Sequence, residues 1–136
     1  MPDMKYGDSA TARRYSHVRN YWEVNQAVVR EMHRQVGDLA LDEHGLARRG
    51  LLVRHLMLPG DLANTETVLA FLAREISTDT YLNLMDQYHP CYKAFEEPPL
   101  DRSLSAEEYG QALRLAEQYG LRRLDRRRRW RGWGYP

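Results

Sequence analysis

Short apolar runs alternate with helix-like segments along this chain, and this alternation constrains the fold more than any other feature. The runs at residues 50–60 (GLLVRHLMLPG) and 79–90 (DTYLNLMDQYHP) have the length of strands. Segments with apolar residues at helical spacing begin near Asn20, Asn64 and Ser105. Strands that alternate with helices favour parallel pairing through crossover connections. The sequence therefore predicts an α/β fold.

The three predicted helices carry signals for their starts and ends. Asn20 with Glu23, and Ser105 with Glu108, have the spacing of a capping box. Gly37 is suited to end the first helix, and the polar residues after it predict a loop. The apolar residues at helical spacing are Val24, Ala27, Val28, Met32 and Val36 in the first helix, Val68, Leu69, Leu72 and Ile76 in the second, and Tyr109, Ala112, Leu113 and Ala116 in the third.

One charged residue lies inside the first apolar run. In a strand, Arg54 faces the same side as Leu52 and Leu56, while Val53 and His55 face the other side. A charge among apolar neighbours is costly unless a counter-charge or a bound anion offsets it. Two interpretations therefore stay open for Arg54, a structural ion pair and an anion-binding position.

The carboxyl ends of the strands are the place to look for a ligand site, because α/β folds bind ligands there. Asp3 and Lys5 are two residues apart and share one side of an extended chain. They fit either a solvated pair near the terminus or a ligand-binding strand edge. His89 fits either a ligand site or an exposed loop. The polar residues expected at this end are Asp3, Lys5, Arg54, His55, Asp86, Gln87 and His89.

Charge is distributed unevenly along the chain. Residues 121–136 hold seven arginines and one aspartate, whereas residues 1–120 hold 13 basic and 18 acidic residues, a net charge of −5. The body is therefore not expected to bind nucleic acid. We expect one folded domain at residues 1–125 and a disordered Arg- and Trp-rich tail at residues 126–136. The alternative for the tail is nucleic-acid binding, with aromatic rings stacked on bases and arginines on phosphates.

Cysteine and histidine usage predicts no metal site. Cys91 is the single cysteine, which excludes an internal disulfide and fits a reducing, cytoplasmic location. The five histidines lack the spacing of a zinc site, and Cys91 is expected to pack rather than react. No apolar run approaches the roughly 20 residues that cross a bilayer, so no membrane partner is expected.

Several short blocks, taken in order, resemble one protein family. The blocks are PDMKYGD, EMHRQVGDL, RGLLVRHLMLPG, STDTYLNLMDQYHP and LDRSLSAEEYGQALRLAEQYGL, and they run from Pro2 to about Asp125. Together they resemble the C-terminal half of radical SAM proteins similar to pyruvate formate-lyase activating enzymes. The resemblance implies the second half of a (β/α)6 partial TIM-type barrel, with parallel strands and crossover helices.

The resemblance also implies a cofactor. Radical SAM proteins hold a [4Fe–4S] cluster on a C-x3-C-x2-C loop and cleave S-adenosylmethionine reductively to methionine and a 5′-deoxyadenosyl radical. In activases, that radical abstracts a hydrogen atom from a glycine of a partner enzyme. By resemblance, Asp3 and Lys5 match the D-x-K pair of the family, and Arg54 and His89 match other positions that face the cofactor. The resemblance implies that these four residues bind S-adenosylmethionine.

The chain departs from the family at the cluster. The cysteine loop and the first strands are absent, and one thiolate cannot hold a cluster that needs three or four. Met1 falls in the middle of a family strand, so we expect a fragment that is inactive alone. Open strand edges are expected to drive self-association, and full-length relatives to act on a glycyl-radical enzyme or another protein. The alternative function is a non-enzymatic interaction module.

Overall fold

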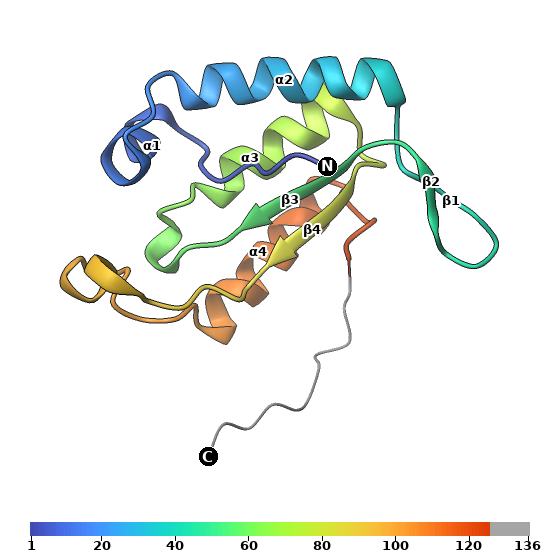
Figure 1. Ribbon diagram of the computed structural model, residues 1–136. Helices are drawn as coiled ribbons and strands as arrows, with labels where there is room; N and C mark the ends of the chain where they lie inside the picture. The colour runs from blue at the N-terminus through green and yellow to red at the C-terminus, as the bar shows by residue number, and fades with distance from the viewer. Residues whose placement is uncertain (126–136) are drawn as a thin grey trace.

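Two five-residue strands pair in parallel at the centre of the fold (Figure 1). The computed structural model describes residues 1–125. Strands β3 (Leu52–Leu56) and β4 (Tyr81–Met85) are in register, with Arg54 opposite Asn83. Both strands come from the predicted apolar runs, and neither contains glycine or proline. The predicted parallel pairing of these two runs is confirmed.

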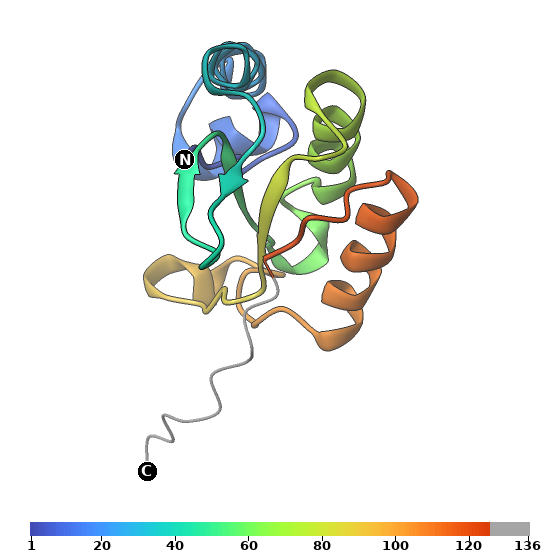
Figure 2. The ribbon, with the colours of Figure 1, turned by 90° about the vertical axis from the view of Figure 1, so that its right-hand side faces the viewer.

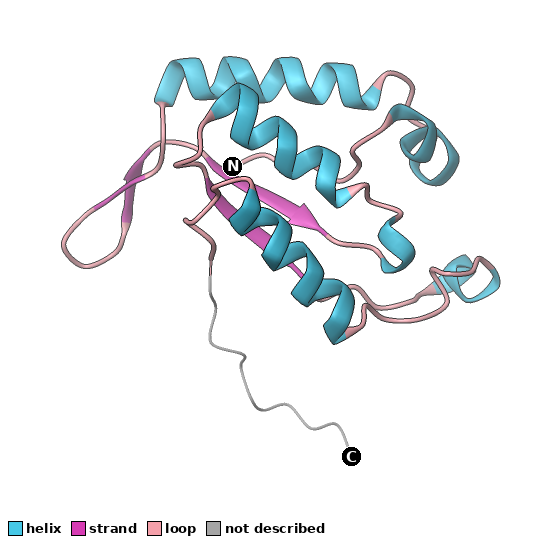
Figure 3. Cartoon of the chain, turned by 180° about the vertical axis from the view of Figure 1, so that it is seen from behind, coloured by secondary structure: helices cyan, strands magenta, loops and turns pink. Residues whose placement is uncertain are grey.

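Helices cover one face of this strand pair. The connection from β3 to β4 contains a 3-10 turn, η1 (Pro59–Asp61), helix α3 (Thr65–Phe71) and a π-helical turn, η2 (Leu72–Ile76). The strands lie in front of α3 and α4 (Ala106–Gln118) in Figure 1, and behind them in Figure 3. In Figure 2, α2 (Tyr21–Val36) lies above the strand pair, and α3 and α4 follow it down the right-hand side. No helix in the described part of the chain covers the opposite face.

The two faces of the strand pair differ in burial. Val53, His55, Leu82 and Leu84 point toward the helices, and each is at most 4% exposed. The residues between them are half-buried on the uncovered face, so the predicted alternation is confirmed. The half-buried residues are Leu52, Arg54, Leu56, Tyr81, Asn83 and Met85.

The N-terminal segment extends the parallel pairing by a single bridge. Asp3 bridges Arg54, and the Met4 N–H donates to the Arg54 carbonyl at 2.8 Å. On its outer side, the Asp3 carbonyl accepts from the Tyr21 hydroxyl at 3.3 Å and from the Asn25 side-chain amide at 3.2 Å. Side chains of α2 therefore satisfy a backbone group that a further strand would otherwise satisfy.

The expectation of a half-barrel is wrong. The described residues form two sheets of two strands each, and one sheet is an antiparallel hairpin of β1 (Ala40–Leu41) and β2 (Ala47–Arg49). A barrel arc needs several strands paired in sequence. Here two five-residue strands pair, and the segments beside them contribute single bridges at Asp3 and Leu124. The hairpin occupies residues predicted as a loop, and the fold is a small α/β domain.

The predicted helix starts are only partly confirmed. In α4, the Ser105 hydroxyl accepts from the Glu108 N–H and the Glu108 carboxylate accepts from the Ser105 N–H, so the capping box is confirmed. At α2, the Asn20 side chain makes no capping bond. The hydroxyl of Ser9 accepts instead from the Trp22 N–H at 2.9 Å. A residue distant in sequence therefore provides the cap of α2.

Two features of the N-terminal half differ from the sequence prediction. A short helix, α1 (Ser9–Ser16), precedes α2 and begins where the Asp8 carboxylate accepts from the Thr11 N–H. In α2, only Val29 is fully buried. The apolar residues at helical spacing correctly predict a helix, but they face solvent. The exposed apolar stripe of α2 consists of Val24, Val28, Met32 and Val36.

Among residues 1–125, no helix combines the length and the apolar composition needed to span a membrane. The tail predicted at residues 126–136 lies outside the described residues. Its expected disorder and its alternative role in nucleic-acid binding stay predictions.

Candidate functional site

Charged side chains meet on the uncovered face of the β3–β4 pair. The Asp3 carboxylate accepts from Arg54 Nε at 2.7 Å and from Lys5 Nζ at 2.7 Å. Asn83 lies opposite Arg54 in β4. Parallel pairing brings these positions side by side, and the alternation of the strands turns their side chains to the same face. We call Asp3, Lys5, Arg54 and Asn83 the charged row.

The Asp3 carboxylate is ionised at neutral pH. Partial burial raises its pKa, but hydrogen bonds and charges from Lys5 and Arg54 outweigh this effect and leave the pKa below its usual value. The Asp3 side chain is 25% exposed, so one side of the carboxylate still faces solvent. The ion pair with Arg54 matches the structural interpretation of that residue.

Arg54 is not saturated by this ion pair. The hydrogen bond to Asp3 uses Nε, and within residues 1–125 no further hydrogen bond or ion pair involves the two Nη atoms of Arg54. The Arg54 side chain is 38% exposed. A guanidinium has five N–H donors in a planar fork, so the remaining donors can bind a carboxylate or phosphate. Both interpretations of Arg54 are therefore compatible with the geometry.

The structure brings together three of the four residues predicted to bind the cofactor. Asp3, Lys5 and Arg54 are in direct contact. His89 lies in the loop after β4, where its Nδ1 is 3.3 Å from the Ser103 hydroxyl, and within residues 1–125 it makes no hydrogen bond to the other three. That these four residues bind S-adenosylmethionine stays a prediction.

His55, next to Arg54 in sequence, has a structural role. It is fully buried on the helix-covered face, with Nδ1 2.5 Å from the Met4 carbonyl and Nε2 3.0 Å from the Thr65 hydroxyl. A carbonyl only accepts, so Nδ1 carries the proton and Nε2 accepts from Thr65. Burial lowers the pKa of His55, and both ring nitrogens are used within the fold.

The residues of this chain do not fit a [4Fe–4S] cluster. Cys91 is the single cysteine in the full sequence, and it is exposed, so the expectation that it packs is wrong. A cluster needs three or four thiolates. Among the described residues, no group of three or more His, Cys, Asp or Glu side chains is arranged to hold a metal ion. Cluster ligands would therefore have to come from residues outside this chain.

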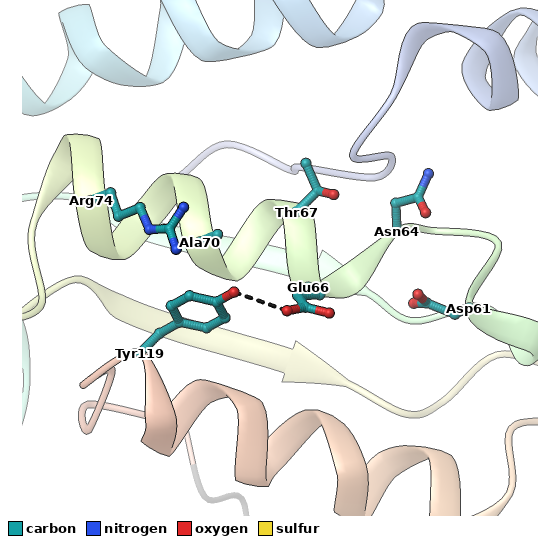
Figure 4. A pocket seen from close by; sticks show the side chains of 7 residues that line it. All are labelled: Asp61, Asn64, Glu66, Thr67, Ala70, Arg74 and Tyr119. Carbon is teal, nitrogen blue, oxygen red and sulfur yellow. Dashed lines mark hydrogen bonds between the residues drawn. The ribbon is translucent and has the colours of Figure 1, made fainter.

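A hollow of about 390 Å³ lies on the helix side, between α3 and the end of α4 (Figure 4). The Tyr119 hydroxyl donates to Glu66 at 2.9 Å, and the Arg74 guanidinium lies 5.5 Å from the centre of the Tyr119 ring. Asp61 accepts from the Thr65 N–H at 3.0 Å. Most polar side chains of this hollow already have partners within the fold, so we do not assign it a ligand.

A second hollow, of about 630 Å³, lies beside α1 and was missed by sequence reasoning. Its cationic side chains are Arg13, Arg14 and Arg19. The sequence signal for it is the stretch ARRYSHVRN, which has three arginines within seven residues. A helix start recognised at Asp8 would have placed two of these arginines on one helix.

Comparison with known proteins identifies one distant relative and no family. No protein-family model matches the chain, and no solved structure matches it. A protein of Methanocaldococcus jannaschii named "Uncharacterized protein MJ0674" is 32% identical over 122 residues. The matched region covers 89% of this chain and 32% of the archaeal protein. The chain therefore spans about a third of the length of this relative.

Proposed function

We propose that this chain provides one wall of an S-adenosylmethionine site in a radical SAM, activase-like protein, and that it is not catalytically competent alone. The observation that carries the proposal is the charged row, in which Asp3 and Arg54 pair on a sheet face without a helix over it. The family resemblance implies the same residues, and the row supports that part of the resemblance independently of the overall fold.

The chemistry of the charged row suits the methionine end of the ligand. Free donors on Arg54 and Lys5 match a carboxylate, and charge-assisted hydrogen bonds of this kind are among the strongest in proteins. The ionised Asp3 can accept from an ammonium group or from ribose hydroxyls. Half-buried Leu56 and Met85 lie opposite one another on the same face and offer apolar contact for an adenine ring.

The remaining parts of the site would come from a longer protein. The relative from M. jannaschii is about three times as long as its matched region, which supports the proposal of a partial site. The [4Fe–4S] cluster belongs to the full-length family in this proposal, as does the partner, a glycyl-radical enzyme or another protein substrate. No reaction step is assigned to residues of this chain.

A titration with S-adenosylmethionine, followed by 1H–15N NMR of the full chain, tests the proposal. One wall of a site predicts saturable binding with a dissociation constant on the order of 1 mM. Arg54→Gln should weaken binding at least about tenfold, because it removes a charge-assisted hydrogen bond. Equal binding by wild type and Arg54→Gln would contradict the proposal.

Two controls make this titration specific. Arg49 is an exposed arginine in β2, at the other end of the strands, so Arg49→Gln removes the same charge and should leave binding unchanged. The second control is 5′-methylthioadenosine, which lacks the carboxylate. It should bind wild type and Arg54→Gln equally.

The exposed apolar stripe of α2 favours a second candidate function, an interaction module. Val24, Val28, Met32 and Val36 are spaced four residues apart and are 38–58% exposed. Ridges of residues four apart are the surfaces that helices use when they pack against one another. Loss of self-association on Val28→Lys, in a chain that shows no saturable binding of S-adenosylmethionine, would favour this function over the first.

A further inference from the structure

The hollow beside α1 has an excess of positive charge. Its polar lining residues are Ser9, Arg13, Arg14, His17, Arg19 and Asn20. We call this hollow the basic pocket. Helix α1 lies beyond the carboxyl ends of β3 and β4 (Figure 1), and the Arg14–Glu97 ion pair at 3.1 Å ties it to the segment that follows β4. The basic pocket therefore lies at the end of the fold where α/β proteins bind ligands.

Two guanidinium groups of the basic pocket have no carboxylate partner. Within residues 1–125, neither Arg13 nor Arg19 forms a hydrogen bond or an ion pair through its side chain, whereas Arg14 pairs with Glu97. Of the ten other arginines in residues 1–125, five have a carboxylate partner. Those with a carboxylate partner are Arg30, Arg34, Arg48, Arg54 and Arg102.

Nearby acidic groups do not neutralise the pocket. Glu23 reaches its rim, where its ionised carboxylate accepts from the Ser9 hydroxyl at 2.6 Å. Glu97 is engaged by Arg14. The first-turn amides of α2 add a partial positive charge on the same side, because the positive end of the helix dipole lies at Tyr21. The three arginines of the pocket therefore exceed these two carboxylates by one charge, although residues 1–120 as a whole have a net charge of −5.

The backbone fixes how Arg19 is presented. His17 and Asn20 both adopt the left-handed conformation, with φ of 55° and 54°. Such residues cost on the order of 1 kcal/mol each unless surrounding contacts hold them. They enclose Val18 and Arg19 in the turn from α1 to α2, so Arg19 faces the arginines of α1 across a short, constrained connection.

We propose that the basic pocket binds a small phosphate-bearing molecule. Guanidinium groups are the preferred side chains for phosphate oxygens, because their planar N–H forks match phosphate geometry. A volume of about 630 Å³ lies within the range of small-molecule sites. A concave site with two free guanidinium groups favours a compact dianionic group over an extended acidic peptide. This site shares no residue with the charged row.

Residue-resolved 1H–15N NMR of the full chain, titrated with inorganic pyrophosphate, tests this proposal. We expect saturable shifts at the amides of residues 9–20. The double variant Arg13→Gln/Arg19→Gln should bind at least about tenfold more weakly, because each lost contact is charge-assisted. Arg49→Gln, which removes an exposed arginine of β2, should bind like wild type. The single variant Arg19→Gln serves as a second test, with an intermediate loss expected.

Three results would overturn the proposal. Shifts confined to residues 126–136, which include five arginines, would assign the binding to the tail. Tighter binding of hexaglutamate than of pyrophosphate at residues 9–20 would identify the pocket as a site for an acidic protein segment. No shift at residues 9–20 would mean that Arg13 and Arg14 only complement the negative end of α1. None of these results bears on the charged row, so failure here leaves the proposed function standing.

Discussion

On one face of the β3–β4 pair, Val53, His55 and Leu82 are fully buried beneath the helices, whereas on the other face Arg54 and Asn83 lie half-exposed in the charged row. The two faces are built from alternate residues of the same ten positions. The polar residues of the two faces also differ in charge and in the use of their hydrogen-bonding groups. His55 is neutral and uses both ring nitrogens inside the fold, while Arg54 is charged and keeps donors free.

This difference separates stability from binding within one sheet. Residues on the covered face contact the core cluster, so their substitution should cost folding free energy. Residues of the charged row contact one another and solvent, so their substitution should cost little stability and affect a ligand instead. The following predictions test this separation, from the largest expected effect to the smallest.

Leu82→Ala should destabilise the domain by about 2–5 kcal/mol, because Leu82 is fully buried in the core cluster and truncation leaves a cavity. The adjacent Asn83→Ala should change the free energy of unfolding by no more than about 0.5 kcal/mol. Urea denaturation of both variants measures the contrast. Similar losses in the two variants would show that the uncovered face is covered in solution.

Stability should fall as pH decreases below His55's ordinary pKa of 6.5. Burial lowers the pKa of His55 in the folded state, so the unfolded chain takes up a proton first and the free energy of unfolding decreases. Above pH 7.5 both states are neutral at this residue and its contribution is constant.

The variant His55→Asn should reduce the slope of the free energy of unfolding against pH between pH 7 and pH 5. This holds even if the variant differs from wild type in stability. The control His44→Asn changes an exposed histidine of the hairpin loop and should retain the slope. Urea denaturation at a series of pH values measures both. An unchanged slope in His55→Asn would mean that His55 is not held neutral by burial.

The chain should self-associate at tens of micromolar, because apolar side chains are half-exposed on the uncovered sheet face and exposed on α2. Leu56→Lys should raise the dimer dissociation constant about tenfold if the uncovered face is the contact. Val28→Lys should do so if the apolar stripe of α2 is the contact. Sedimentation equilibrium compares the two variants, and a wild-type monomer at these concentrations would contradict the prediction.

The smallest effect is expected within the charged row itself. A double-mutant cycle with Asp3→Asn and Arg54→Gln should give a coupling energy of about 0.2–1 kcal/mol, because both side chains are partly exposed and solvent screens the pair. Urea denaturation of the four proteins measures it. A coupling above about 2 kcal/mol would indicate a pair with a primarily structural role.

The sequence was sufficient to predict the strand pair and its two faces. Apolar runs of strand length, together with the two-residue alternation around Arg54 and Asn83, correctly assign every side chain of β3 and β4 to its face. The contact of Asp3, Lys5 and Arg54 matches the expected grouping. The predicted capping box of Ser105 and Glu108, which involves only neighbouring residues, is also confirmed.

The errors arise where the structure depends on tertiary contacts. The cap of α2 comes from Ser9, which no local pattern around Asn20 indicates. The hairpin of β1 and β2 has strands of two and three exposed residues, too short for a periodic signal. The half-barrel followed from a family resemblance, and local sequence blocks do not determine how many strands pair.

The most direct test of the central claim is a side-chain-resolved NMR titration of the full chain with S-adenosylmethionine. The charged row predicts saturable chemical-shift changes of the Arg54 Nε–H and the Asn83 side-chain amide. The methyl signals of Leu82 and Leu84 on the covered face should not shift. Saturable shifts at the Leu82 and Leu84 methyls without any change at Arg54 and Asn83 would contradict the assignment of the site to the uncovered face.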